Sequence, residues 1–120
     1  MKITALMPMR HSSERVPGKN YRMFNGKPLF HHVLESLLAV NDVERVVINT
    51  DSKIIVDQCE RLFPKVDCIE RPAELLGGEV PMTEILQHDA QLFPSDWFLQ
   101  THSTNPLLSA ATIASAIKAL

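Results

Sequence analysis

The chain has 120 residues and a mass of 13.5 kDa, the size of one domain with its own hydrophobic core. Hydrophobic residues make up 45% of it and charged residues 22%, as in ordinary globular proteins. The net charge of -2 argues against nucleic acid as the main partner. The apolar run before Arg10 is too short for a signal peptide or a membrane span, so we expect a cytoplasmic protein without a membrane partner.

Strand and helix patterns alternate along the chain. Short apolar or β-branched runs predict strands at 2–8, 45–50, 66–69 and 97–100. Apolar residues at helical spacing predict helices at 28–40, 51–63, 83–93 and 109–120. We expect Pro28 in the first turn of the first helix, Asp51 or Ser52 as the cap of the second, and Ser109 as the cap of the last. The alternation predicts one three-layer α/β/α domain over residues 1–120, with a mostly parallel, Rossmann-like sheet.

The connection between the first strand and the first helix, residues 7–27, is unusually long, because such connections usually have about two to six residues. It holds one acid, Glu14, and five cations: Arg10, Arg15, Lys19, Arg22 and Lys27. Two further irregular connections, 71–81 and 101–108, follow the third and fourth strands. Since the carboxyl ends of parallel strands lie at one edge, these loops should gather there and form a phosphate-binding rim.

Neither common phosphate-binding motif is present. The sequence has no GxxxxGK[ST] and no GxGxxG, which disfavours a P-loop NTPase and a dinucleotide-dependent dehydrogenase. What remains is a loop that meets phosphates with Arg and Lys side chains and with turn amides near Pro17 and Gly18. Such a loop suits nucleotidyl transfer, because fixed cations stabilise the charge that builds on the α-phosphate and on departing pyrophosphate.

Residues 8–29, PMRHSSERVPGKNYRMFNGKPL, resemble the amino-terminal signature of the CMP-sugar synthetases, the cytidylyltransferases that activate acylneuraminates and 3-deoxy-octulosonates. That signature runs roughly A-R-x-x-S-x-R-x-P-x-K-N, followed by G-K-P-L. Further along, residues 49–51 resemble the family's S-T-D and residues 71–75 its R-P-x-E-L. Residues 98–100 and 105–107 resemble its L-L-Q-P-T-S-P-L. Asn20 favours the acylneuraminate branch over the octulosonate branch.

The resemblance implies the fold of the nucleotide-diphospho-sugar transferases and the transfer of CMP from CTP to a keto-sugar acid, with release of pyrophosphate. It assigns these residues to nucleotide binding: Met9, Arg10, Ser13, Arg15, Lys19, Asn20, Arg71 and Gln100. Arg10 and Lys19 would hold the triphosphate and act in catalysis, and Arg71 and Gln100 would face the cytidine. Ser13 would shape the loop, while Asn20 would contact the ribose or a phosphate.

The resemblance also implies Mg²⁺, with ligands that we expect outside this chain, and a homodimer for the full-length family. The chain departs from the pattern at Glu14, where the acylneuraminate enzymes commonly have Lys, and at the longer 101–105 segment. Family members are also much longer. The chain is thus expected to be a fragment or a shortened homologue, and two alternatives stay open. One is a nucleotide-binding or assembly module without catalysis, and the other is a sugar nucleotidyltransferase for another base.

Several polar residues have simpler interpretations. Asp51 could contact a metal, although capping the following helix explains it more simply. The helix histidines His31, His32 and His88 are expected on the surface. Cys59 and Cys68 are expected to be reduced packing residues.

Overall fold

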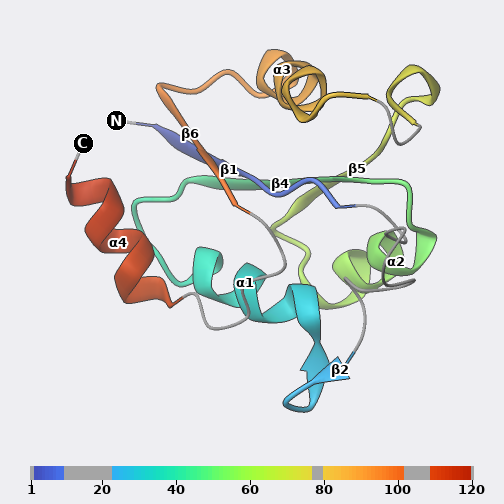
Figure 1. Ribbon diagram of the computed structural model, residues 1–120. Helices are drawn as coiled ribbons and strands as arrows, with labels where there is room; N and C mark the ends of the chain where they lie inside the picture. Colours follow the sequence, from blue (N-terminus) through green and yellow to red (C-terminus); the bar gives the residue numbers. More distant parts are fainter. Residues whose placement is uncertain (1, 10–22, 77–79, 102–108, 120) are drawn as a thin grey trace.

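The computed structural model describes residues 2–9, 23–76, 80–101 and 109–119, and every structural statement below refers to these residues. Its centre is a parallel four-stranded sheet with the strand order β5-β4-β1-β6 (Figure 1). The strands are β1 (Ile3–Leu6), β4 (Arg45–Thr50), β5 (Asp67–Glu70) and β6 (Trp97–Gln100). The prediction of a parallel sheet is therefore confirmed, with strand positions within a residue or two of those expected.

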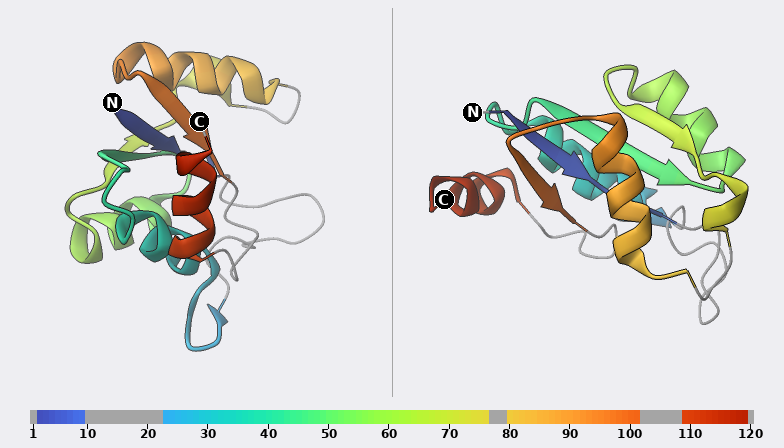
Figure 2. Two further views of the ribbon diagram at one scale, coloured as in Figure 1. Left: turned by 90° about the vertical axis from the view of Figure 1, so that its left-hand side faces the viewer. Right: turned by 90° about the horizontal axis from the view of Figure 1, so that it is seen from above.

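Helices cover both faces of this sheet. Helices α1 (Leu29–Leu38), α2 (Lys53–Leu62) and α4 (Ala110–Lys118) lie on one face, and α3 (Met82–Leu92) lies on the other (Figures 1 and 2). A short 3-10 helix, η2 (Ala73–Leu75), follows β5. The three-layer α/β/α arrangement expected from the sequence is confirmed. None of these helices is both long enough and apolar enough to span a lipid bilayer.

The two inner strands are buried on both sides, which explains their continuous apolar sequence. In β1, Ile3 and Ala5 belong to the main core beneath the sheet, together with Ile48 of β4 and the inner face of α1. Asn49, the neighbour of Ile48, points to the opposite face and bonds to α3. Side chains alternate between the faces along a strand, so a strand covered by helices on both faces needs buried residues at every position.

The residues before α1 form an antiparallel hairpin that the sequence analysis did not anticipate. Strands β2 (Met23–Phe24) and β3 (Lys27–Pro28) are joined by Asn25 and Gly26, whose φ angles are 49° and 83°. Two successive positive φ angles at Asn-Gly are the signature of a tight hairpin turn. Pro28 consequently ends β3 and precedes α1, where it is the N-cap residue instead of lying in the first turn.

The connection 7–27 between the first strand and the first helix is also ordered at its beginning, where the backbone continues to pair with β4. Beyond β1, the backbone N–H of Met7 donates to the Val47 carbonyl, and that of Met9 donates to the Asn49 carbonyl, both at 2.9 Å. The first strand thus continues alongside β4 almost to the end of that strand. What lies between Met9 and the hairpin is outside the described residues.

His31 corrects a sequence expectation, because it is buried and not on the surface. It is 6% exposed between α1 and α2, and its ring makes edge-on contacts with Phe30 and Phe63. Its Nε2–H donates to Oε1 of Gln58 at 2.8 Å. Burial lowers the pKa of His31 and thereby favours the neutral ring, an effect that the Gln58 hydrogen bond partly opposes. The buried face of α1 includes one position more than the apolar residues alone predicted. A histidine fits at this position because Gln58 accepts the hydrogen bond of its ring.

The two cysteines lie side by side where α2 packs on β5. Cys59 is buried in the core, and Cys68 is half-buried against it. Both are free thiols. A hydrogen bond to Cys68 and burial together raise the pKa of the Cys59 thiol, so this thiol stays protonated.

Candidate functional site

The carboxyl ends of the parallel strands meet at one edge of the sheet, as the sequence predicted. Met9 follows β1, Asp51 follows β4, Arg71 follows β5, and Gln100 is the last residue of β6. Of the eight residues assigned to nucleotide binding, Met9, Arg71 and Gln100 are therefore at this edge. The other five lie outside the described residues: Arg10, Ser13, Arg15, Lys19 and Asn20.

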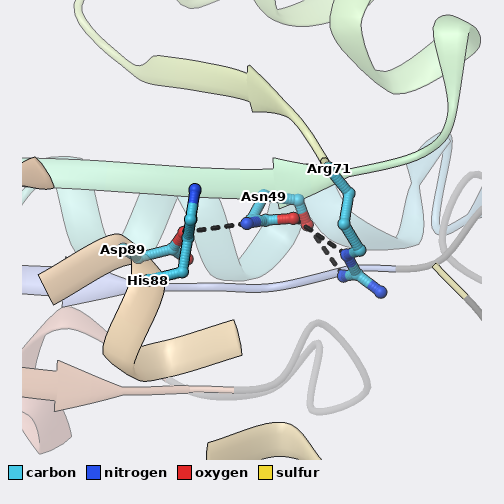
Figure 3. A network of polar contacts seen from close by, with 4 residues as sticks. All are labelled: Asn49, Arg71, His88 and Asp89. Atoms are coloured by element: carbon cyan, nitrogen blue, oxygen red, sulfur yellow. Dashed lines mark hydrogen bonds and ion pairs between the residues drawn. The ribbon is translucent and has the colours of Figure 1, made fainter. Parts of the chain in front are cut away.

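Arg71 is the central residue of the described edge. Its side chain is folded inward, and the residue is only 8% exposed. Its Nε–H donates to Oδ1 of Asn49 at 2.8 Å, and its Nη2 donates to the backbone carbonyl of Asn49 at 3.1 Å. The same nitrogen donates to the carbonyl of Met9 at 3.4 Å. The guanidinium thus connects the ends of β1, β4 and β5. Figure 3 shows its bonds to Asn49.

The backbone also holds Arg71 in place. Its own N–H donates to the Thr50 carbonyl at 2.9 Å, which continues the β4–β5 ladder past the last strand residue. The rigid fork of an arginine side chain presents five donors and no acceptor. Backbone and side chain together fix this fork at the strand ends, the position expected of a group that recognises a nucleotide. Met9 and Arg71, assigned separately from two motifs, are therefore in direct contact.

Behind Arg71 lies a buried polar network that the sequence analysis did not identify (Figure 3). Nδ2 of Asn49 donates to Oδ1 of Asp89 at 2.8 Å, and both residues are completely buried. Nδ1 of His88 contacts the same carboxylate oxygen at 3.1 Å, and the side chain of His88 is partly exposed at the surface. The other oxygen, Oδ2 of Asp89, is buried without a hydrogen-bond partner among the described residues.

A sequence signal for this network exists. Asn49 is a polar residue inside a run of buried strand residues, and Asp89 comes four residues after the buried Ile85 on the inner face of α3. A buried polar group needs a hydrogen-bond partner, so two such residues on facing elements are candidates to pair. The sequence analysis treated Asn49 only as part of a motif and did not consider Asp89.

Gln100 lies at the other side of the edge. It pairs in register with Leu6 of β1, and the following residue, Thr101, donates its N–H to the Leu6 carbonyl at 3.1 Å. Gln100 is exposed at the end of β6. Arg71 contacts the carbonyl of Met9, just past β1, from the side of β4 and β5. Gln100 lies on the other side of β1, so the two residues flank the end of this strand.

A cavity of about 190 Å³ opens at the same edge, at the start of α2. Its lining includes two carboxylates, from Asp51 and Glu70, and two cations, from Lys53 and Arg71. Ser52 is the N-cap of α2, since its Oγ accepts the N–H of Ile55 at 3.3 Å. Of the two cap candidates, the structure therefore selects Ser52, and Asp51 precedes the helix and lines this cavity.

Lys27, one of the cations of the long connection, has a partner on the adjacent helix. Its Nζ lies 2.7 Å from Oε2 of Glu35, and both side chains are about half exposed. No cluster of three or more His, Cys, Asp or Glu side chains able to hold a metal ion occurs in the described part of the chain.

The fold and its carboxyl edge define an α/β protein of the Rossmann-like class. The family model described as cytidylyltransferase matches residues 4–120, nearly the whole chain. The chain therefore belongs to the cytidylyltransferase family.

Curated relatives agree with this assignment. The 3-deoxy-manno-octulosonate cytidylyltransferase of Geotalea daltonii is 32% identical over 120 residues, which cover 100% of this chain and 45% of that protein. The CMP-N,N'-diacetyllegionaminic acid synthase of Legionella pneumophila is 46% identical over 57 residues, or 48% of this chain and 25% of that protein. The chain thus spans less than half the length of these relatives.

Solved structures share the fold. A CMP:2-keto-3-deoxy-manno-octonic acid synthetase complexed with CTP superposes with a TM-score of 0.84 at 22% identity, covering 99% of this chain and 47% of that one. A cytidylyltransferase from Leptospira borgpetersenii superposes with a TM-score of 0.77, also at 22% identity, covering 100% and 49%. These similarities confirm the fold class predicted from the sequence.

Proposed function

We propose that the protein containing this chain transfers CMP from CTP to a sugar acid and releases pyrophosphate. The observation that carries the proposal is the family match over residues 4–120. The described edge supports it, because an arginine fixed at the carboxyl ends of parallel strands suits the binding of a nucleotide there. In this reaction an anomeric hydroxyl oxygen of the sugar bonds to the α-phosphorus, and the bond from that phosphorus to the bridging oxygen of pyrophosphate breaks.

The residues divide between the two parts of the nucleotide. Arg10 and Lys19 would hold the triphosphate, because fixed cations stabilise the charge of the transition state and of the leaving pyrophosphate. Arg71 and Gln100 would face the cytosine, whose polar edge can pair with guanidinium and amide groups. The family resemblance also implies Mg²⁺, which when bound would neutralise phosphate charge.

The finer proposal is an acylneuraminate-like keto-sugar acid as the acceptor. The motif with Asn20 supports it, and so does the 46% identity to a CMP-N,N'-diacetyllegionaminic acid synthase, although over only 57 residues. A 3-deoxy-octulosonate is the second candidate, because relatives named for that substrate align over the whole chain. We also propose that the whole protein is a cytoplasmic homodimer, from the free cysteines and from the sequence resemblance.

Pyrophosphate release by the purified intact protein tests both levels of the proposal. CTP with a divalent metal and either an acylneuraminate or a 3-deoxy-octulosonate should give turnover, and the preferred acid identifies the branch. A site that hydrogen-bonds one base should reject UTP or ATP by about 10⁴-fold, because its polar groups would be left unpaired. Equal rates with UTP would contradict the cytidylyl assignment. CTP binding without turnover for any sugar acid would favour the non-catalytic module.

A further inference from the structure

The side-chain amide of Asn49 has two different neighbours at the same distance. Its oxygen accepts the Nε–H of Arg71 at 2.8 Å, and its nitrogen donates to Oδ1 of Asp89 at 2.8 Å. All three residues are buried, so water cannot replace either bond without opening the structure. Asn49 therefore connects Asp89 of α3 to Arg71 at the end of β5 (Figure 3).

Both neighbours demand the same orientation of this amide. An arginine can only donate hydrogen bonds, so it must face the oxygen of Asn49. Oδ1 of Asp89 accepts a hydrogen bond at 2.8 Å, and only the amide nitrogen of Asn49 can donate one, so Asp89 faces the nitrogen. The opposite orientation of the amide would place two donors against each other and two acceptors against each other. The contact with Asp89 thus supports the amide orientation that presents an acceptor to Arg71.

The network is costly in one respect. Oδ2 of Asp89 is buried and has no hydrogen-bond partner among the described residues, and an unsatisfied buried oxygen destabilises a fold. An apolar residue at this position of α3 would avoid that cost and would continue the apolar face that Ile85 begins. Packing alone therefore does not account for Asp89, whereas the orientation of Asn49 does.

We propose that Asp89, acting through Asn49, is a positioning residue for nucleotide recognition by Arg71. The inference rests on the proposed function, in which Arg71 faces the cytosine. By fixing the acceptor for Nε, Asp89 holds the guanidinium in one orientation before the nucleotide binds. An arginine ordered in advance loses less side-chain freedom on binding and discriminates better between bases.

Exchange of the amide and the carboxylate provides the test. In Asn49→Asp two buried carboxylates face each other, so the hydrogen bond between residues 49 and 89 is lost and is replaced by repulsion. In the double variant Asn49→Asp/Asp89→Asn, a carboxylate at 49 accepts from both Arg71 and the amide at 89. The double variant has the same atom types and formal charge as the wild-type protein, with the direction of one hydrogen bond reversed. Its rescue therefore reports on the arrangement of the network and not on its composition.

The measurements are the dissociation constants of the intact protein for CTP and UTP, together with its melting temperature. Asn49→Asp should weaken CTP binding by about tenfold or more and reduce the preference over UTP, because repulsion between the carboxylates at 49 and 89 displaces the acceptor that holds Arg71. The double variant should recover most of both. Asp89→Ala, which removes the acceptor without adding a charge, should show the same loss and replaces Asn49→Asp if that variant does not fold.

Ile85→Ala is the matched control, since it weakens the packing of the same buried face of α3 without touching the amide network. It should lower the melting temperature and leave the CTP preference unchanged. The proposal is overturned if Ile85→Ala reduces that preference as much as Asp89→Ala does. It is also overturned if the double variant folds and binds CTP as poorly as Asn49→Asp.

A second measurement separates this inference from the proposed function. Hydrogen exchange at Nε of Arg71, followed by NMR, reports on the guanidinium whatever nucleotide the protein binds. Exchange should be slow in the wild-type protein and in the double variant, and fast in Asp89→Ala. If the wild-type protein shows no preference for CTP, the proposed function fails. Equally slow exchange in Asp89→Ala instead refutes the positioning role.

Discussion

Nε2 of His31 donates to Oε1 of Gln58 at 2.8 Å and so links α1 to α2 inside the protein. The ring is wedged between Phe30 and Phe63, and its burial lowers the pKa of His31. Protonation of this ring would place a charge in an apolar contact. We therefore expect the pairing of these two helices to weaken when His31 is protonated.

We expect the protein to lose stability as the pH falls below the ordinary histidine pKa of about 6.5. His31 has a lower pKa when folded than when unfolded, so between these two values the unfolded chain binds more protons and acid favours unfolding. Above both values the contribution is fully present. Thermal unfolding between pH 8 and pH 5 should show the decline, and His31→Gln should flatten it. His32→Gln, the next residue on α1, is the control. An unchanged slope in His31→Gln would contradict the assignment.

Arg10→Ala should reduce turnover far more than stability. Arg10 lies outside the described residues, and the prediction rests on the family motif. Loss of one preorganised transition-state contact typically costs about 3 to 4 kcal/mol, roughly 10²- to 10³-fold in rate. A surface ion pair would contribute only about 0 to 1 kcal/mol to stability and nothing to the rate. Steady-state kinetics of pyrophosphate release distinguishes the two.

Lys19→Ala should behave like Arg10→Ala, whereas Arg22→Ala serves as the control and should be nearly neutral. Unchanged kinetic constants in Arg10→Ala, combined with loss of activity in Arg22→Ala, would show that the motif has been aligned in the wrong register.

Residues 1–120 expressed by themselves should be nearly inactive in CMP transfer. The curated relatives are about twice as long, and the described residues provide no cluster of metal ligands. Pyrophosphate release by this polypeptide, compared with the intact protein at equal concentration, measures the difference. Robust turnover by a preparation free of longer protein would show that the chain is sufficient for catalysis and would direct attention to Asp51, which lines the edge cavity, or to Glu79, which lies outside the described residues.

Gly26→Ala should destabilise the hairpin before α1. Gly26 has a φ of 83°, and a Cβ there would meet no atom within 4 Å, so the cost is the backbone strain alone. That strain is about 1 to 2 kcal/mol for a residue with a side chain. Denaturant unfolding provides the measurement.

Asn25→Gly is the matched substitution at the neighbouring turn position, where φ is 49°. It relieves a positive φ while adding freedom to the unfolded chain, so its net effect should stay within about 0.5 kcal/mol. A loss in Asn25→Gly as large as that in Gly26→Ala would indicate that the Asn25 side chain, and not the backbone, stabilises the turn.

The sequence predicted the elements well wherever local pattern and tertiary environment agree. The β-branched run of β4 and the caps Ser52 and Ser109 are examples, since Oγ of Ser109 accepts the N–H of Thr112 as expected. The hairpin at Asn25 and Gly26 was predictable from turn chemistry, and it was missed because the whole 7–27 segment was interpreted as one ligand loop.

The remaining differences depend on contacts between distant segments. His31 lies on the inner face of α1 because Gln58, on another helix, satisfies its ring nitrogen. Asn49 and Asp89 are 40 residues apart, and neither residue by itself indicates the pairing. The edge was predictable because parallel strands place their carboxyl ends together, whereas the residues that support Arg71 from behind depend on how α3 docks.

The residues that hold Arg71 in place are far apart in the sequence, and this has a consequence for folding. Arg71 reaches back 62 residues to the Met9 carbonyl, and in the described structure α3 covers its face of the sheet without another helix beside it. Contacts between such distant segments form only after long loops have closed, so an intermediate with an assembled sheet and an undocked α3 would lack the acceptor for Asn49. A nucleotide that binds only the completed edge would stabilise the docked state by mass action. In that case CTP would favour the docking of α3 on the sheet, although α3 contacts Arg71 only through Asn49. Protection of α3 from proteolysis would then rise with nucleotide concentration.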